Sequence, residues 1–395
     1  MHGQSFSTSY AKGFLAKSCL ILTERRVKNE GGSKRKNRQH DVITLSSHRP
    51  PALSPVNFSA RFFPMKYRPK TPPEAMPFQR GRRPARPPVA QPLPLEWISP
   101  AVWSSLAAEG TDAHRIASGN DMWLERFAHD VLLSYQTEPG RDAVLAELDQ
   151  RCAAYSFRPR RVFGKYLPHH ASERGAPSLL RGEAGESLET EVSEAGARYG
   201  LDFAGGYSAG LFIDQRANRA RLRALKPKRL LNTFAYTCSF SVVAAQVGAE
   251  TVSVDLSRRS LTRGEGNFVK NGFDPKAGHR FIADDVLAVL PRLARRGDKF
   301  DAIILDPPTF SRNQAGAAFQ VQRDFERLVT LALEVAAPGA NLLLSVNHSA
   351  MRVADLEWVA RTALKLAGRS GRFSTTSPLA DFPSGHGAKT TWLSL

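Results

Sequence analysis

Asp306 and the two prolines that follow it are the residues of this chain best suited to chemistry. They come directly after the apolar run 300–305, which is predicted to form a buried strand. Proline cannot donate a hydrogen bond to a sheet, so the strand must end there, and the residue before a proline is held extended. Pro307 and Pro308 therefore form a stiff ledge at the carboxyl end of a strand, where open α/β sheets bind ligands. A carboxylate on such a ledge suits an enzyme that holds a planar base beside a cofactor.

Two further aspartates follow predicted strands in the same part of the chain. Asp255 comes after the apolar strand 251–254, and Asp285 comes shortly after the strand 279–283. At a strand tip, Asp255 can accept hydrogen bonds from both hydroxyls of a ribose. Asp285 can accept a hydrogen bond from an adenine amino group. Each aspartate could instead be the N-cap of the helix that follows it, but their regular placement, together with Asp306, favours a nucleoside ligand.

The elements that must position these aspartates alternate between strand and helix. This alternation is typical of a parallel, doubly wound α/β sheet. Two alternating segments near the end of the sequence, 372–377 and 390–395, are predicted to close the sheet as a hairpin. The predicted strands cover residues 229–234, 251–254, 279–283 and 300–305, and the helices between them cover 241–247, 258–271 and 286–296.

The loop after the first strand, residues 235–240, bears on the choice of cofactor. It contains no glycine and so lacks the G-x-G-x-x-G fingerprint that cradles a dinucleotide pyrophosphate. S-adenosylmethionine has no phosphate and needs only a backbone loop close to its methionine end, which the small residues Cys238 and Ser239 permit. The pattern therefore predicts an S-adenosylmethionine-dependent methyltransferase that acts on a nucleobase.

Six motifs, in order, resemble the bacterial 23S ribosomal RNA large-subunit methyltransferases I and K. They lie between about residue 190 and the end of the chain, at 210–216, 234–237, 254–257, 267–268, 271–272 and 306–311. The resemblance implies a Rossmann-like class I methyltransferase sheet, mostly parallel with an antiparallel C-terminal strand, preceded by a small α+β domain. It also implies cofactor contacts from Gln215, Arg216, Phe234, Tyr236, Thr237, Ser239, Asp255, Leu256, Ser257, Asp285 and Asp306.

Three details of the motifs matter for the reaction. Residues 306–311 and 319–324 look more like the K type, which methylates guanine N7. The family's usual Tyr-Thr-Gly loop is Tyr236-Thr237-Cys238 here. Gln215 and Arg216 could hold the cofactor carboxylate, with the guanidinium as a fork-shaped donor. Alternatively, Asp214 caps a helix that turns Arg216 and Arg219 to solvent; the resemblance favours the binding role.

The cysteines help to choose between targets. Methylation of cytosine C5 generally needs a thiolate that attacks the ring. The chain contains only Cys19, Cys152 and Cys238, and none lies near Asp306 or in the later strand tip, 342–349. Guanine N7 carries an in-plane lone pair, so proximity and alignment can supply catalysis without a protein nucleophile. Cytosine C5 methylation, and a small-molecule or protein methyltransferase on the same fold, remain as alternatives, and no metal or disulfide is expected.

Composition separates the first quarter of the chain from the rest. Residues 1–98 hold 18 Lys and Arg against 5 Asp and Glu, a net charge of +13, and 13 of the 26 prolines lie between positions 50 and 94. Such a segment cannot bury enough apolar surface to fold alone, so residues 1–94 are predicted to be a disordered basic arm that contacts RNA phosphates. A cytoplasmic protein without a membrane span is expected. Alternatively, residues 1–64 are a mitochondrial or chloroplast transit peptide, or precede the true start at Met65.

The remaining segment, residues 95–205, is predicted to be a small α+β domain ahead of the methyltransferase domain at 206–395. It includes a helix at 142–152 and a hairpin at 189–203. Basic residues interleaved with aromatic residues in this segment could track an RNA backbone and stack a base. An ordinary edge strand with its aromatic residues facing the core is the alternative. The residues concerned are Arg158, Arg160, Arg161 and Lys165, with Phe157, Phe163 and Tyr166.

Overall fold

The computed structural model describes residues 95–395 except 169, 171–172, 184, 313–315, 317 and 384–385. The basic arm predicted for residues 1–94 lies outside the described residues. The described part of the chain contains a six-stranded sheet followed by a seven-stranded sheet. None of the helices in this part is long and apolar enough to cross a bilayer.

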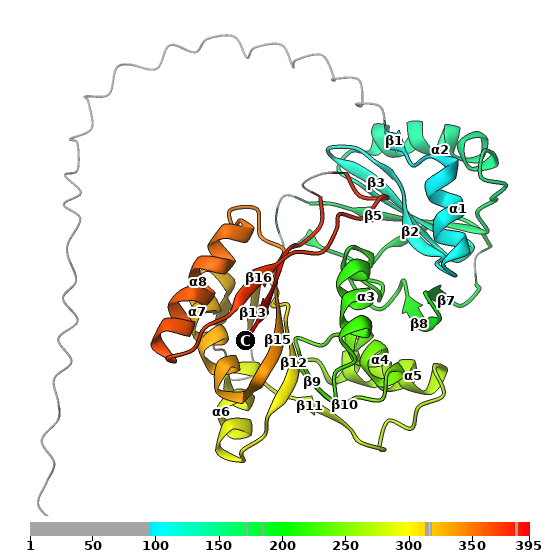
Figure 1. The fold of residues 1–395 in the computed structure, drawn as a ribbon. Coiled ribbons are helices and arrows are strands. Elements are labelled where there is room, and N and C mark those ends of the chain that lie inside the picture. The colour runs from blue at the N-terminus through cyan, green and yellow to red at the C-terminus, as the bar shows by residue number, and fades with distance from the viewer. Residues whose placement is uncertain are drawn as a thin grey trace, which may run out of the picture. The chain divides into compact units, whose positions relative to one another are not determined.

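The seven-stranded sheet carries the three aspartates, and its strands run in the order β11-β10-β9-β12-β15-β17-β16 (Figure 1). The strands from β11 to β15 are parallel to their neighbours, and β17 and β16 are antiparallel. The predicted mostly parallel sheet with an antiparallel C-terminal strand is thereby confirmed. The strands are β9 (Arg229–Thr233), β10 (Glu250–Asp255), β11 (His279–Ala283), β12 (Phe300–Leu305), β15 (Ala336–Val346), β16 (Arg372–Ser374) and β17 (Lys389–Ser394).

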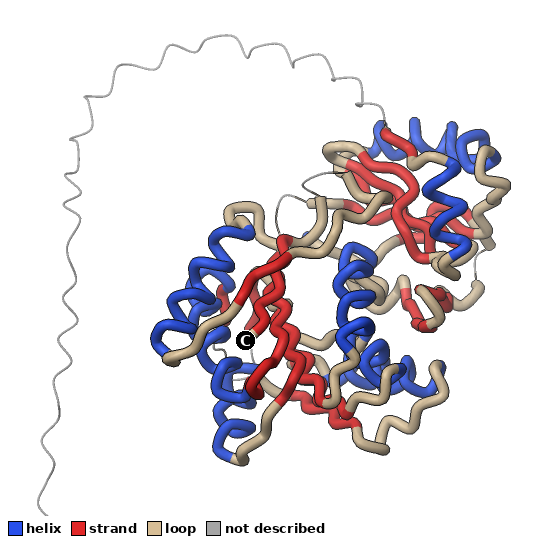
Figure 2. Tube along the Cα trace, in the orientation of Figure 1, coloured by secondary structure: helices blue, strands red, loops and turns tan. Residues whose placement is uncertain are grey.

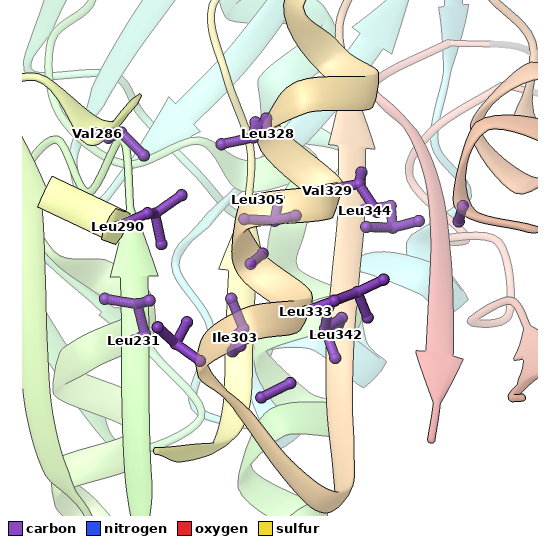
Figure 3. Close-up of a cluster of buried hydrophobic side chains, with 14 of the residues drawn as sticks. Leu231, Val286, Leu290, Ile303, Leu305, Leu328, Val329, Leu333, Leu342 and Leu344 are labelled. Atoms are coloured by element: carbon purple, nitrogen blue, oxygen red, sulfur yellow. The ribbon is translucent and has the colours of Figure 1, made fainter. Parts of the chain in front are cut away.

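Helices cover both faces of this sheet (Figure 2), because successive residues of its strands point to opposite sides. Leu231 and Ile303 face the layer formed by α6, α7 and α8 (Figure 3). Their neighbours Leu230 and Ile304 pack against α3 and α4 on the other face. The helices are α3 (Arg216–Leu225), α4 (Ser239–Gln246), α5 (Arg258–Lys270), α6 (Val286–Arg295), α7 (Val321–Val335) and α8 (Val353–Leu366).

The six-stranded sheet precedes this layer structure, in the order β1-β2-β3-β4-β5-β6. Only β4 and β5 are parallel, and helix α2 connects them. Leu148 and Cys152 of α2 are buried against the sheet, as the helix predicted at 142–152 requires. The elements are β1 (Glu96–Trp97), α1 (Pro100–Ala108), β2 (Ala113–Ser118), β3 (Met122–Phe127), β4 (Asp130–Tyr135), α2 (Glu138–Ala153), β5 (Arg161–Tyr166) and β6 (Ser178–Arg181).

Strand β5 corrects the prediction of an RNA-tracking segment. The side chain of Arg161 is only 1% exposed and forms an ion pair of 2.6 Å with the fully buried Asp130. Phe157 and Phe163 are buried in the core. The alternative is right that these aromatic residues face the core, but its edge strand is wrong, because β5 lies between β4 and β6. Only Arg158, Arg160 and Tyr166 of the original set are exposed.

Two segments join the smaller sheet to the larger one. The predicted hairpin consists of β7 (Glu189–Glu194) and β8 (Ala197–Asp202), and Glu194 forms two hydrogen bonds of 2.6 Å with the guanidinium of Arg219 in α3. The long connection between β16 and β17 carries Asp381, which accepts the backbone N–H of Arg115 at 3.0 Å and also pairs with Arg216. The boundary predicted at residues 205 and 206 stays a prediction.

Candidate active site

The carboxyl edge of the seven-stranded sheet gathers the predicted residues in the order of its strands. Asp285 follows β11, Asp255 ends β10, the loop 234–238 follows β9, and Asp306 follows β12. Neighbouring strands lie about 4.8 Å apart, so the row extends over roughly 15 Å. The edge thus offers carboxylates on both sides of a backbone loop.

Asp255 is half-buried and holds the backbone of two loops. Its Oδ2 accepts the N–H of Tyr236 at 2.8 Å, and its Oδ1 accepts the N–H of Ser257 at 2.8 Å. Burial raises the pKa of this carboxyl above its usual value, although the two N–H donors oppose the shift. The alternative that Asp255 caps α5 is wrong, because Ser257 is the N-cap and accepts the N–H of Ser260 at 3.1 Å.

The alternative role for Asp285, a helix N-cap, is confirmed. It is the N-cap of α6, and its Oδ1 accepts the N–H of Leu287 at 2.9 Å. The preceding Asp284 accepts the backbone N–H of Asp285 at 2.7 Å and forms an ion pair with Arg292. Asp285 therefore has a structural role, and its predicted contact with adenine stays a prediction.

The loop after β9 has an unusual backbone. Phe234, Tyr236 and Cys238 all adopt positive φ, at 53°, 49° and 62°, a conformation that costs a non-glycine residue about 1 kcal/mol or more. Several bonds hold it in place: the Tyr236 hydroxyl donates to Ser208 O at 2.6 Å, and the Asn267 side chain donates to Thr237 O at 2.9 Å. Strain maintained by so many contacts is typical of functional sites.

Cys238 adopts a positive φ, a backbone conformation that favours glycine. The cysteine fits because Gly264 of α5 faces it: a Cβ at Gly264 would lie 2.5 Å from the Cys238 sulfur. Burial raises the pKa of the thiol to about 12. Cys238 is therefore a packing residue of the loop.

Gln215 and Arg216 lie between the two sheets and are buried. The Gln215 amide donates to Asp306 Oδ2 at 3.2 Å and to Ser345 Oγ at 2.9 Å. Arg216 pairs with Asp381, and its Nη1 is buried without a hydrogen-bond partner among the described residues. The solvent-facing alternative is wrong for Arg216, and equally for Arg219. The helix cap expected of Asp214 in that alternative is also wrong, because Asp214 Oδ2 accepts the N–H of Ala388 at 3.0 Å and the N-cap position of α3 belongs to Gln215.

Asp306 is half-buried at the end of β12, next to a buried Pro307 and an exposed Pro308. Burial raises the pKa of its carboxyl to about 6; hydrogen bonds from Ser345 and Gln215 lower it, and the nearby Asp214 raises it. The Thr309 hydroxyl anchors the ledge by donating to Asn347 O at 2.9 Å. The two prolines and this anchor fix the carboxylate at the sheet edge.

Residues 126–386 match the sequence model of a family described as S-adenosylmethionine-dependent methyltransferases. This chain belongs to that family. It is 31% identical to the Ribosomal RNA large subunit methyltransferase I of Enterobacter sp. (strain 638) over 286 residues, which cover 67% of this chain and 68% of that protein. The identity is 44% over 194 residues with the Ribosomal RNA large subunit methyltransferase K/L of Chromohalobacter salexigens, covering 48% of this chain.

The match to the K/L enzyme extends over only 25% of that protein's length. Among solved structures, a methyltransferase crystallised with SAH superposes with a TM-score of 0.64 at 24% identity, over 74% of this chain and 78% of that one. At this identity the likeness shows the fold. It agrees with the strand order described above.

This methyltransferase uses S-adenosylmethionine, and the sheet edge suits that cofactor. The hydrogen bonds of Asp255 within the described structure come from two backbone N–H groups, so its oxygens keep lone pairs for hydroxyl donors. The Nη1 of Arg216, which has no hydrogen-bond partner in the part of the chain that the structure describes, is a donor that suits a carboxylate. Across the described ranges, no three His, Cys, Asp or Glu side chains are grouped to hold a metal.

The remaining predicted cofactor residues lie along the same edge. Thr237 is buried, and the half-buried Phe234 packs its ring 5.5 Å from that of Phe319. Ser239 begins α4, while Leu256 and Ser257 connect β10 to α5. Their contacts with the cofactor stay predictions.

The sequence reasoning missed several partners of these residues. Ser345 lies within an apolar strand, Asn218 within an arginine-rich helix, and Asp381 in a long connection. Their hydrogen-bond partners, Gln215 or Arg216, lie 3 to 165 residues away in the sequence. Of the three, only Asn218 carried a local signal, because it lies one helical turn after Gln215.

Proposed function

We propose that this methyltransferase modifies a base nitrogen of large-subunit ribosomal RNA, with guanine N7 the favoured atom. The names of the I and K/L relatives support the RNA class. The K-type character of residues 306–311 and 319–324 supports the choice of guanine N7. The bound cofactor supplies an electrophilic methyl group.

The state of the cysteines is the observation that carries the choice of a ring nitrogen over cytosine C5. Cys152 is buried in the core of the smaller sheet, and burial raises the pKa of its thiol to about 11. Cys238 is buried against α5, and the pKa of its thiol is about 12. Burial disfavours the thiolate of both, and neither lies on the Asp306 ledge, so neither described cysteine supplies the thiolate that attack on cytosine needs.

The ledge has the features that a ring nitrogen requires. Attack by guanine N7 makes the ring cationic, and an ionised Asp306 beside the base stabilises that developing charge. The exposed Pro308 offers a rigid apolar surface against which a base can lie, while the buried Pro307 holds the carboxylate in position. No proton must be removed before attack, so Asp306 positions and stabilises rather than acting as a strong base.

Binding of the cofactor is assigned to the row of residues along the sheet edge. Asp255 receives the ribose hydroxyls, Asp285 the adenine amino group, and Arg216 the carboxylate. Gln215 contributes through Asp306, because both N–H groups of its amide already have partners. The backbone of the strained loop lies between these groups and passes close to the methionine end.

The substrate implies a location and a further contact. Ribosomal RNA in a bacterial cell is cytoplasmic, so we place the protein there, or in an organelle if residues 1–64 act as a transit peptide. Residues 1–94, outside the described part of the chain, supply a basic arm for RNA phosphates.

Incubation with methyl-labelled S-adenosylmethionine and separate RNA fractions tests the substrate class. Large-subunit ribosomal RNA should take up label, whereas small-subunit RNA and transfer RNA should not. An Asp306→Asn variant is the matched control, because it keeps the shape of the ledge and removes its charge. Label that appears only in protein or in small molecules would contradict the proposal.

A further inference from the structure

A chain of buried hydrogen bonds runs from the last strand of the sheet to Asp306. The indole N–H of Trp392 in β17 donates to Asn218 Oδ1 at 2.9 Å. The Asn218 amide donates to Gln215 Oε1 at 2.8 Å. The Gln215 amide donates to Asp306 Oδ2 at 3.2 Å and to Ser345 Oγ at 2.9 Å. Four of the five side chains are almost wholly buried, and Asp306 is half-buried at the outer end.

The direction of this hydrogen-bond chain is decided at its inner end, because the carboxyl group of Asp306 at the outer end can accept a hydrogen bond when ionised and donate one when protonated. A carboxamide can turn by 180° with little steric consequence, because its oxygen and nitrogen are nearly the same size. An indole nitrogen can only donate. Trp392 therefore requires the oxygen of Asn218, which leaves the Asn218 nitrogen for the oxygen of Gln215. The nitrogen of Gln215 must then face Asp306 and Ser345.

We propose that the indole N–H of Trp392 sets this direction, so that Trp392 and Asn218 are positioning residues that keep Asp306 a hydrogen-bond acceptor at the sheet edge. The catalytic meaning of this arrangement rests on the proposed role of Asp306. The reversed chain would turn the Gln215 oxygen toward the carboxylate. Two acceptors would then face each other in a poorly solvated site, which destabilises the ionised form of Asp306.

The groups around Asp306 make its pKa a direct reporter of the direction. This pKa is raised to about 6, chiefly by burial, and the nearby Asp214 contributes to the rise. Hydrogen bonds from Ser345 and Gln215 lower it, as does the charge of Arg219. Loss of the Gln215 donor should therefore raise the pKa of Asp306 by about one unit, the size expected for one hydrogen bond to a charged group.

The test is a carbon-13 NMR titration of protein labelled at its aspartate carboxyl groups, with Asp306→Asn used to assign the resonance. Trp392→Phe removes the donor that sets the direction, and Asn218→Leu removes the link while keeping the side-chain volume close. Leu343→Ala is the matched control, because Leu343 lies opposite Trp392 in the sheet and in the same core but has no polar group.

We expect the pKa of Asp306 to rise by about one unit in both Trp392→Phe and Asn218→Leu and to stay at the wild-type value in Leu343→Ala. If Trp392→Phe does not fold, Asn218→Leu decides the question. An unchanged pKa of Asp306 in folded Trp392→Phe or Asn218→Leu would overturn the proposal, and so would an equal rise in Leu343→Ala. The titration uses no RNA, so failure to find a methylated RNA would contradict the proposed function and leave this result intact.

Discussion

Replacing Asp255 with alanine should weaken cofactor binding by about 1.5–3 kcal/mol, or roughly 10- to 150-fold, as expected for lost hydrogen bonds to a charged acceptor. The carboxylate also holds the backbone N–H groups of Tyr236 and Ser257, each at 2.8 Å. Alanine leaves both without this partner, so the strained loop should loosen as well. The measured loss of affinity will therefore have two parts, the lost hydrogen bonds to the cofactor and the loosening of the loop.

Two ligands and one control variant separate these parts. Calorimetric titration with S-adenosylhomocysteine gives the total loss, and the 2′-deoxy analogue removes one ribose hydroxyl. Asn267→Ala is the matched control, because it releases the same loop at Thr237 O, a bond of 2.9 Å, and leaves Asp255 in place. The wild type and Asn267→Ala should both bind the deoxy analogue more weakly than the parent, while Asp255→Ala should bind the two equally.

Equal affinities of the wild type and Asp255→Ala for S-adenosylhomocysteine would refute the reasoning. So would a variant that still discriminates against the deoxy analogue as strongly as the wild type does. In either case Asp255 would be only an anchor for the loop.

Three further predictions concern the loop, the reacting carboxylate and the arm. Gly264→Ala should cost about 1–3 kcal/mol of stability by overpacking against Cys238, and adding Cys238→Gly should restore most of it; thermal denaturation with no recovery would contradict the close contact. Methyl transfer should fall as the pH drops through about 6, because the pKa of Asp306 is raised to about 6 and the ionised form is the active one; a fall in rate only near pH 4 would argue against this role. Asp306→Asn should lose roughly 100-fold in turnover at neutral pH, with little change in cofactor affinity. Deleting residues 1–94 should weaken RNA binding and flatten its dependence on salt while cofactor affinity stays constant; an unaltered salt slope would remove the arm from RNA recognition.

The sheet and its aspartates could be predicted because their signals are local. An apolar run followed at once by an aspartate marks both a strand and its carboxyl end, as at Asp255 and Asp306. Regular alternation with helices then placed these ends at one edge. The sequence could not decide whether Asp255 caps α5, since Asp255 and Ser257 are both favoured caps and only the backbone geometry identifies Ser257 as the cap.

The arginines could not be placed in this way. Arg161, Arg216 and Arg219 look solvent-facing by residue type, yet all three are buried. Their carboxylate partners lie 25 to 165 residues away in sequence. A buried charge is tolerated only when such a partner arrives through tertiary structure. For the same reason the sequence did not reveal the hydrogen bond between Trp392 and Asn218, which lie 174 residues apart.

The identity of the methylated nucleoside tests the central claim most directly. Large-subunit ribosomal RNA would be treated with the wild type and with a variant in which Cys19, Cys152 and Cys238 are all serine or alanine, then digested and measured by mass spectrometry. We expect 7-methylguanosine from both proteins, because the attacking lone pair belongs to the base. Finding 5-methylcytosine, or a covalent adduct between the wild type and RNA containing 5-fluorocytosine, would contradict the account.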